Sequence, residues 1–145
     1  MGMFDAMGIS ASGMTAQRLR MDIVSQNIAN VNSTRDANGD VYRRKMVVME
    51  EKDGTPFADV LMMTAGRNGC GVKATKIIED TKTELKGVYD PSHPDSDENG
   101  YVWYSNVNTV TEMTDLIDAS RAYEANVTAF NAAKSMALKG LEVGK

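Results

Sequence analysis

Apolar residues near the N-terminus recur with the spacing of a helix seam. In a seven-residue repeat, two positions face the seam. Met7, Met14, Met21 and Ile28 occupy the first of them, and Val24 and Val31 occupy the second. The pattern predicts one long helix at this end of the chain. Glycines and serines in its first half lower helix propensity by up to about 1 kcal/mol per glycine. We therefore expect that half to be ordered by packing against other helices.

A second and longer seam lies toward the C-terminus. Its members include Met113, Leu116, Tyr123, Val127, Phe130 and Leu141. Thr109 and Glu112 precede it with the spacing of a capping box, in which each side chain accepts a hydrogen bond from the other residue's amide. We predict a helix from about residue 109 to 142, roughly 50 Å long at 1.5 Å per residue. Because that length exceeds what one small core covers, the helix is expected to need partner helices.

The segment between the helices alternates turn-forming residues with β-branched runs. Candidate strands are residues 41–51, 57–63, 72–79, 85–89 and 101–104, and the main loops are 33–40, 66–71 and 90–100. The predicted fold class is mainly α, with long end helices in coiled-coil packing and a short β-rich middle insertion. We expect three parts, which are an N-terminal helix in 1–32, a β-rich middle module in 33–108 and a C-terminal helix in 109–145.

Composition narrows the classes of function. The 145 residues suit one domain, and a formal net charge of −4 lacks the basic excess that a nucleic-acid partner requires. The short basic run Arg43, Arg44 and Lys45 is interpreted as a solvated strand face. No stretch approaches the roughly 20 apolar residues of a transmembrane helix, and the N-terminal segment lacks the pattern of a secretory signal. Eleven methionines suit a surface that adapts to several packing partners.

Residues for catalysis or metal binding are sparse. Cys70 is the only cysteine and His93 the only histidine, so the sequence offers no internal disulfide and no zinc site of the usual kind. The run from Asp95 to Gly100 matches the opening of a calcium loop, but Asn106 stands where the bidentate glutamate belongs. The favoured interpretation is an acidic turn whose side chains bond their own backbone. We expect no cofactor, no metal and no small-molecule substrate.

A cluster of amide side chains closes the first predicted helix. Gln26, Asn27 and Asn30 stand where stronger helix formers are usual. Asn27 and Asn30 share one helix face. Because an amide both donates and accepts, these side chains can set one helix in register against another. The alternative is a group of solvated asparagines near a helix end.

Residues 25–32, SQNIANVN, resemble the signature of the axial proteins of the bacterial flagellum, which form its rod, hook and hook-associated parts. Residues 89–145, including the acidic DPSHPD loop, resemble the proximal rod proteins of the FlgC type over nearly their whole length. The resemblance implies a structural subunit without enzymatic activity. It would polymerise with other rod proteins into the drive shaft that transmits torque from motor to hook, and it would be required for flagellum assembly and motility.

The same resemblance implies partners, a location and an interface. Expected partners are the other flagellar rod proteins, the adaptor protein at the rod base, the membrane-embedded ring there and the flagellar type III export apparatus. The expected location is the periplasmic rod of the basal body, reached without a cleaved signal peptide. The predicted assembly interface consists of seam and amide residues, namely Met7, Met14, Met21, Val24, Gln26, Asn27, Ile28, Asn30, Val31, Met113, Leu116, Tyr123, Asn126, Val127, Phe130 and Leu141.

Three alternatives stay open. A small hydrolase would use Cys70, His93 or the acidic loop. A soluble binding module would pair its own two helices into a stable monomer. Another short rod protein of the same axial family would share the helical signatures but not the DPSHPD loop.

Overall fold

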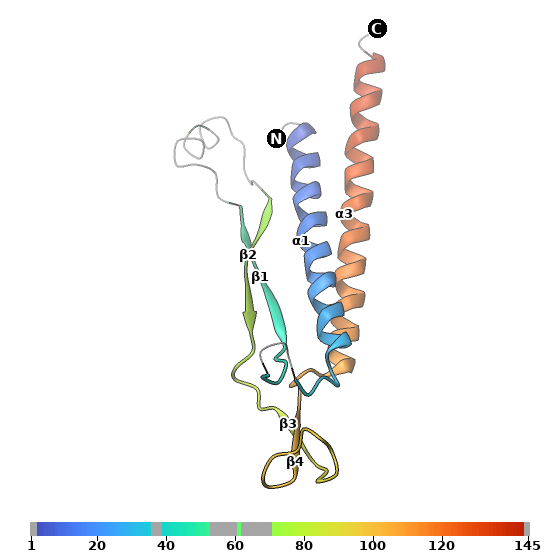
Figure 1. Ribbon diagram of the computed structural model, residues 1–145. Helices are drawn as coiled ribbons and strands as arrows, with labels where there is room; N and C mark the ends of the chain where they lie inside the picture. Colours follow the sequence, from blue (N-terminus) through green and yellow to red (C-terminus); the bar gives the residue numbers. More distant parts are fainter. Residues whose placement is uncertain (1–2, 36–38, 53–60, 62–70, 144–145) are drawn as a thin grey trace.

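The computed structural model describes residues 3–35, 39–52, 61 and 71–143. Two long helices, α1 (Met3–Ala29) and α3 (Thr109–Val143), lie side by side and antiparallel (Figure 1). A hairpin of β1 (Lys45–Glu51) and β2 (Val72–Glu79) runs beside α1, and a hairpin of β3 (Lys86–Tyr89) and β4 (Tyr101–Tyr104) projects below the helix pair. The predicted fold class, mainly α with a small β insertion, is confirmed.

Helix α1 lies between α3 and the β1–β2 hairpin, so it is covered on two sides (Figure 1). Its buried apolar side chains are Ala16, Ile23 and Val24, and α3 contributes Ala119 and Ala133. These side chains are mostly small, so the two helices approach closely. A Cβ atom on Gly13 would lie only 2.7 Å from Oδ1 of Asn126. Because the contact is narrow, the apolar core formed by the described residues is modest.

The contact between the helices does not use the whole predicted seam of α3. Its deepest positions are Glu112, Ala119 and Ala133. Glu112 comes one residue before Met113 of the predicted seam, and the other two are alanines that a search for large apolar residues overlooks. The seam residues Leu116, Tyr123 and Phe130 are half-buried. Met113, which is 54% exposed, and Leu141, which is 72% exposed, point to solvent. One stripe of α3 therefore pairs with α1 while a neighbouring stripe stays uncovered.

The register of the helices leaves one end of α3 uncovered. Asn27 contacts Glu112, and Gly13 lies against Asn126 at a matching distance along both helices. By this register Met3 lies level with Met136, so the residues after Met136 extend beyond α1. At 1.5 Å per residue the extension is roughly 10 Å long, and it is visible in Figure 1.

The β1–β2 hairpin is tied to α1 near its upper end. The pairing runs from Lys45 opposite Glu79 to Glu51 opposite Val72. The Ser12 hydroxyl on α1 accepts a 3.0 Å hydrogen bond from the amide of Val72. Gly71 has a φ of +93°, and a Cβ atom there would collide with Ser12. Glycine is thus needed at residue 71, where the chain passes close to α1 just before β2 begins.

The predicted strands 72–79, 85–89 and 101–104 are confirmed, the second beginning one residue later than predicted. The strand predicted at 41–51 begins only at Lys45, because residues 41–44 lead into the polar cluster described below. The predicted strand 57–63, the loop 66–71 and Cys70 lie wholly or largely outside the described residues. The division into three parts stays a prediction. Within the described residues, no helix is long and apolar enough to cross a membrane.

The predicted capping box at the start of α3 is wrong. Asn108 caps the helix, because its Oδ1 accepts a 3.1 Å hydrogen bond from the amide of Val110. The Glu112 amide donates to the carbonyl of Asn108 in the ordinary helical pattern. The Glu112 carboxylate points away from the helix end and bonds to partners on other elements.

Candidate functional site

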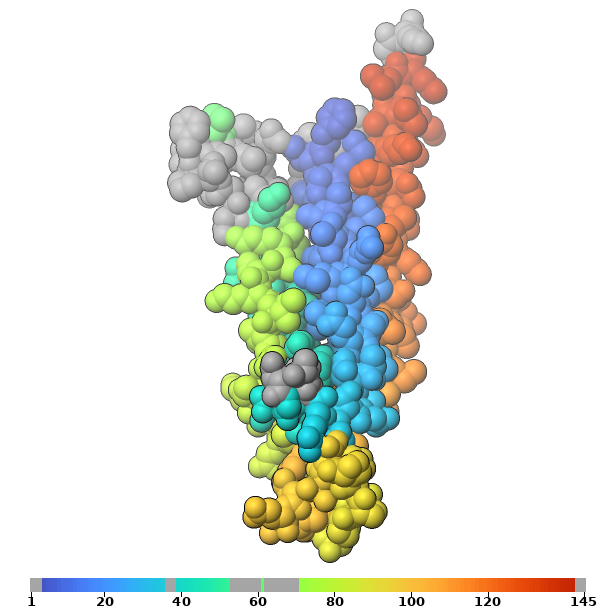
Figure 2. Space-filling model, viewed as in Figure 1, coloured from blue at the N-terminus to red at the C-terminus, as the bar shows by residue number. Residues whose placement is uncertain are grey.

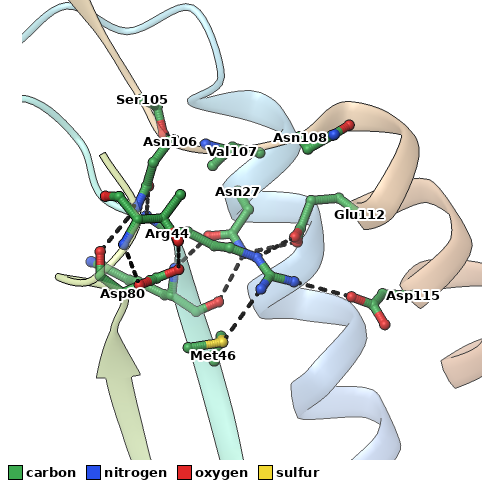
Figure 3. Close-up of polar contacts among 12 residues, drawn as sticks. Asn27, Arg44, Met46, Asp80, Ser105, Asn106, Val107, Asn108, Glu112 and Asp115 are labelled. Atoms are coloured by element: carbon green, nitrogen blue, oxygen red, sulfur yellow. Dashed lines mark hydrogen bonds and ion pairs between the residues drawn. The ribbon is translucent and has the colours of Figure 1, made fainter. Parts of the chain in front are cut away.

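A buried polar cluster joins both helices to the β1–β2 hairpin where the lower ends of the three meet (Figure 3). Asn27 lies near the end of α1, and Arg44 immediately precedes β1. Glu112 and Asp115 lie in the first turns of α3. The cluster is where segments far apart in the sequence are held together.

Asn27 is fully buried, and its amide makes four hydrogen bonds. Its Nδ2 donates to the carbonyl of Lys45 at 2.8 Å and to Oε2 of Glu112 at 2.9 Å. Its Oδ1 accepts from the amide of Lys45 at 2.9 Å and from the hydroxyl of Tyr42 at 3.0 Å. Both donors and both acceptor positions of the side chain are thus used. A single amide fixes α1 to the strand entry and to α3.

Glu112 is also fully buried, and its charge is balanced by Arg44. Arg44 Nε donates to Oε1 of Glu112 at 2.6 Å, and its terminal nitrogen donates to Asp115 at 3.1 Å. Arg20 on α1 donates to the other oxygen of Asp115 at 2.9 Å. The two guanidinium groups and two carboxylates alternate along one chain of contacts, so the cluster carries no net charge. The Arg44 guanidinium also donates to the sulfur atom of Met46.

Asn106 extends the cluster into the segment that follows β2. Its Oδ1 accepts from the amide of Arg44 at 2.8 Å, and its Nδ2 donates to the carbonyls of Asp80 and Thr83. Asp80 in turn closes a tight turn, because its carboxylate accepts from the amides of Lys82 and Thr83 and from the Thr83 hydroxyl. The hydroxyl of Thr83, followed by these amides, holds the pKa of the Asp80 carboxyl below its ordinary value.

Replacing Thr83 by valine is expected to raise the pKa of Asp80 toward the ordinary value of a carboxyl, because the strongest bond to the ionised form is lost. In the natural chain, the ionised Asp80 stabilises the fold above the carboxyl pKa of the unfolded chain, about 4. That contribution is lost as the pH falls through the lower folded pKa. Carboxyl carbon shifts followed by NMR during an acid titration measure the change.

Thr81 provides the matched control, since it is exposed and lies in the same turn. Thr81→Val should leave the pKa of Asp80 where it is. The pKa of Asp90, which is held low by the Ser92 hydroxyl and amide, should stay unchanged in both variants. An unchanged Asp80 titration in Thr83→Val would contradict the assignment of the hydroxyl as the main cause.

Asp95 and Asp97, in the acidic loop between β3 and β4, have protein donors. Asp95 accepts from the Thr34 hydroxyl and pairs with the Arg35 guanidinium at 2.7 Å. Asp97 accepts from the indole N–H of Trp103. His93 Nδ1 accepts from the amide of Asp95. Among the described residues, no group of three or more His, Cys, Asp or Glu side chains is placed to hold a metal ion.

The structure places the predicted interface residues differently. Asn27 is buried and bonded within the chain, so its amide has an intrachain role. Asn30 donates to the carbonyl of Gln26 and accepts from Ser33, which closes the end of α1, and Gln26 is exposed. The remaining residues fall into two groups. Buried or half-buried are Met7, Met14, Met21, Val24, Ile28, Val31, Leu116, Tyr123, Asn126, Val127 and Phe130, whereas Met113 and Leu141 are exposed. Their role in assembly stays a prediction.

Sequence reasoning missed most of the buried cluster. The basic run of residues 43–45 predicts a solvated strand face, but the Arg44 guanidinium lies between two carboxylates. Glu112 and Asp115 were not singled out as a pair. One signal was present, namely the amide at Asn27, which marks the helix face on which the cluster forms. The chain itself gave no indication that its partners are the residues just before β1 and at the start of α3.

The cluster is suited to holding elements together. A groove beside it is lined by Arg20, Arg44, Glu112 and Asp115 with apolar neighbours such as Ile23. Each of these four charged side chains is paired with another member of the cluster. A charge committed in this way is poorly placed to act on a substrate. The geometry therefore favours a structural role.

Sequence comparison finds known proteins that are similar to this chain over its whole length. Residues 7–35 match the family described as flagella basal body rod protein, and residues 98–143 match the C-terminal region described for flagellar basal body rod FlgEFG proteins. The flagellar basal-body rod protein FlgC of Bacillus subtilis is 48% identical, with 98% of each chain covered. The FlgC protein of Borreliella burgdorferi is 43% identical over 99% of this chain and 98% of its own length. That of Salmonella typhimurium is 37% identical over the full length of both chains.

Proposed function

Because this chain belongs to the FlgC family of flagellar basal-body rod proteins and is a structural subunit of that rod, we propose that it polymerises with other rod proteins into the shaft that transmits torque to the hook. The observation that carries the proposal is the similarity to rod proteins from one end of the chain to the other. The role proposed is mechanical, and we propose no catalytic step for it.

The uncovered stripe of α3 supports assembly through the helices. Val110, Met113 and Ile117 recur at helical spacing and are each more than half exposed. Apolar side chains in such a stripe are stabilised when a neighbouring helix covers them, at about 25 cal/mol per Å² of buried apolar area. Helices packed in this way along a shaft resist bending and twisting, which torque transmission requires.

We further propose the partners and the location that the family suggests. Neighbouring subunits would be the other rod proteins, and the rod base would contact the adaptor protein and the membrane-embedded ring. The subunit would reach the periplasmic rod through the flagellar type III export apparatus without a cleaved signal peptide. The modest apolar core of the described residues supports this route, because a fold that buries few large side chains there costs less to unfold for passage through a channel.

Expression of this chain in Bacillus subtilis cells that lack their own FlgC protein is expected to restore swimming and to place the chain in isolated basal bodies. Met113→Asp should abolish both, because it puts a charge on the uncovered stripe at a position too exposed to matter for folding of the subunit. Thr111→Asp is the matched control, since Thr111 is exposed and lies two residues earlier. Absence of the expressed chain from basal bodies would contradict the proposal.

A further inference from the structure

The β3–β4 hairpin has two different faces, because side chains alternate along each strand. Val102 lies on one face and is fully buried. Tyr89, Tyr101 and Trp103 lie together on the other face, where they are between 40% and 65% exposed. We call these three residues the tip patch. Figure 2 shows that the hairpin projects from the rest of the molecule, so its aromatic face is open to a partner.

The three rings of the tip patch are held in place by their neighbours. The rings of Tyr89 and Tyr101 meet edge to face, with centroids 5.4 Å apart. The ring of Trp103 lies over Gly87, where a Cβ atom would come within 3.1 Å of it, and its indole N–H donates to Asp97. Rings that are already fixed lose little conformational entropy on binding. The tip patch is therefore preorganised for contact with a partner.

Carboxylates border the tip patch. The loop of residues 90–100 passes close to the Tyr89 ring, because a Cβ atom at Gly100 would lie 3.0 Å from it. This loop contains no lysine or arginine, and its carboxylates are those of Asp90, Asp95, Asp97 and Glu98. Asp97 and Glu98 are exposed. A group that binds to the rings therefore also meets negative charge.

Most of the positive charges near the tip are engaged elsewhere. Arg35 pairs with Asp95 at 2.7 Å. The Lys86 ammonium donates to a backbone carbonyl just before α3. Lys82 and Glu84, which precede β3, offset each other in charge. Within the described part of the chain, four carboxylates therefore stand against one guanidinium at the tip, and the tip is acidic.

The rings and the carboxylates of the tip favour the same kind of ligand. The face of an aromatic ring carries partial negative charge, so it attracts a cation, as a carboxylate does. An anionic ligand would need hydrogen-bond donors, and the indole N–H of Trp103 is already bonded to Asp97. Among cationic side chains arginine fits best, because its planar guanidinium stacks on rings and binds a carboxylate through two parallel hydrogen bonds.

We propose that the tip patch and its bordering carboxylates bind an arginine-bearing segment of another protein. Guanidinium groups would stack on the exposed faces of Trp103 and Tyr89 and would bond to the carboxylates of Asp97 and Glu98. A second copy of this chain is a poor match for the acidic tip, because the chain has a net charge of −4. The inference goes beyond the proposed rod function and does not depend on it, since it concerns binding by the free subunit.

Trp103 is the only tryptophan of the chain, so the fluorescence of the purified full chain reports directly on the tip. The probe is a synthetic hexa-arginine peptide. Its binding is expected to change the emission saturably and to weaken as the salt concentration rises, because exposed charges are screened. A hexalysine peptide of the same charge should bind about two- to fivefold more weakly, because an ammonium group lacks the planar face that stacks on a ring.

Two variants separate the rings from the carboxylates. Tyr89→Leu removes the most exposed ring but keeps apolar bulk, and Glu98→Gln removes one exposed charge. Each should weaken hexa-arginine binding about two- to fivefold. Val88→Ala, on the opposite face of the hairpin, and Glu84→Gln, an exposed carboxylate before β3, are the matched controls and should bind as the natural chain does. Circular dichroism verifies each fold, and if Tyr89→Leu disturbs the hairpin, Glu98→Gln decides alone.

Three results would overturn the proposal. Hexa-arginine could leave the emission unchanged, or it could bind the tip variants as tightly as the controls, in which case binding would follow net charge alone. Chitotetraose, a neutral sugar, could saturate the emission change at every salt concentration, which would assign the rings to a glycan. The swimming test in Bacillus subtilis distinguishes these failures from failure of the rod function. A chain that restores swimming without binding hexa-arginine keeps its rod role and loses this inference.

Discussion

Replacing Arg44 by methionine is expected to lower the free energy of unfolding by about 3–5 kcal/mol, the range for removing one partner of a buried ion pair. The reason is that Glu112 is fully buried and would keep only the Asn27 amide as a partner for its charge. Asp115 would lose one of its two guanidinium contacts in the same step. Urea unfolding followed by circular dichroism measures the loss.

The double variant Arg44→Met, Glu112→Leu separates the charge from the shape of the site. Replacing both members of a buried ion pair by apolar residues of similar volume is often neutral for stability. We therefore expect the double variant to recover most of the stability that Arg44→Met alone loses. Such a positive coupling would show that the uncompensated carboxylate causes the loss.

Arg18→Met is the matched control, since Arg18 is exposed on α1, two residues before Arg20. Its expected effect is within about 0.5 kcal/mol, as for most surface substitutions. If Arg44→Met were as mild as Arg18→Met, the pair would contribute nothing and the cluster would not hold the elements together. If the double variant were less stable than either single variant, the packing of the side chains and not their charge would be decisive.

The extent of the helices and strands could be predicted because their signals are local. The helical period identified α3, and the β-branched run identified β2 (Val72–Glu79) with its observed bounds. Glycine and proline residues indicated the loop between β3 and β4. None of these inferences needs knowledge of which segments meet in space.

The partners of polar side chains could not be predicted in the same way. The spacing of Thr109 and Glu112 fits a capping box, but a local bond to an amide competes with a guanidinium from a segment 68 residues away. In a buried position the charged partner wins, because it offsets the cost of desolvating the carboxylate. Asn108 then takes over the cap. A local pattern gives no information about such a distant competitor.

Asn27 shows how far the sequence could go. The sequence predicts that an amide on the helix face sets one helix in register against another. In the structure the Asn27 amide makes such a contact between α1 and α3 of one chain. The prediction of a contact between chains remains a prediction. The sequence also indicated that long helices need partners. It did not show that part of this need is met inside the subunit, where α1 packs against α3.

Replacing Asn27 by leucine is expected to have the other large effect, a loss of about 3 kcal/mol or more in the free energy of unfolding. Leucine is close in volume, but it leaves the hydroxyl of Tyr42, the backbone of Lys45 and the carboxylate of Glu112 without this partner. Each buried polar group left unpaired costs about 1–3 kcal/mol. Thermal unfolding followed by circular dichroism would detect the change as a lower Tm.

The matched control is Asn131→Leu, because Asn131 is exposed in α3 and leucine is the better helix former. We expect that variant to be as stable as the natural chain or slightly more so. A Tm for Asn27→Leu equal to that of Asn131→Leu would mean that water replaces the lost amide bonds, and the site could not then be regarded as sealed. The contrast between two asparagines in the two helices thus measures what burial adds to a single amide, and with it how firmly the subunit holds α1, α3 and the hairpin as one body.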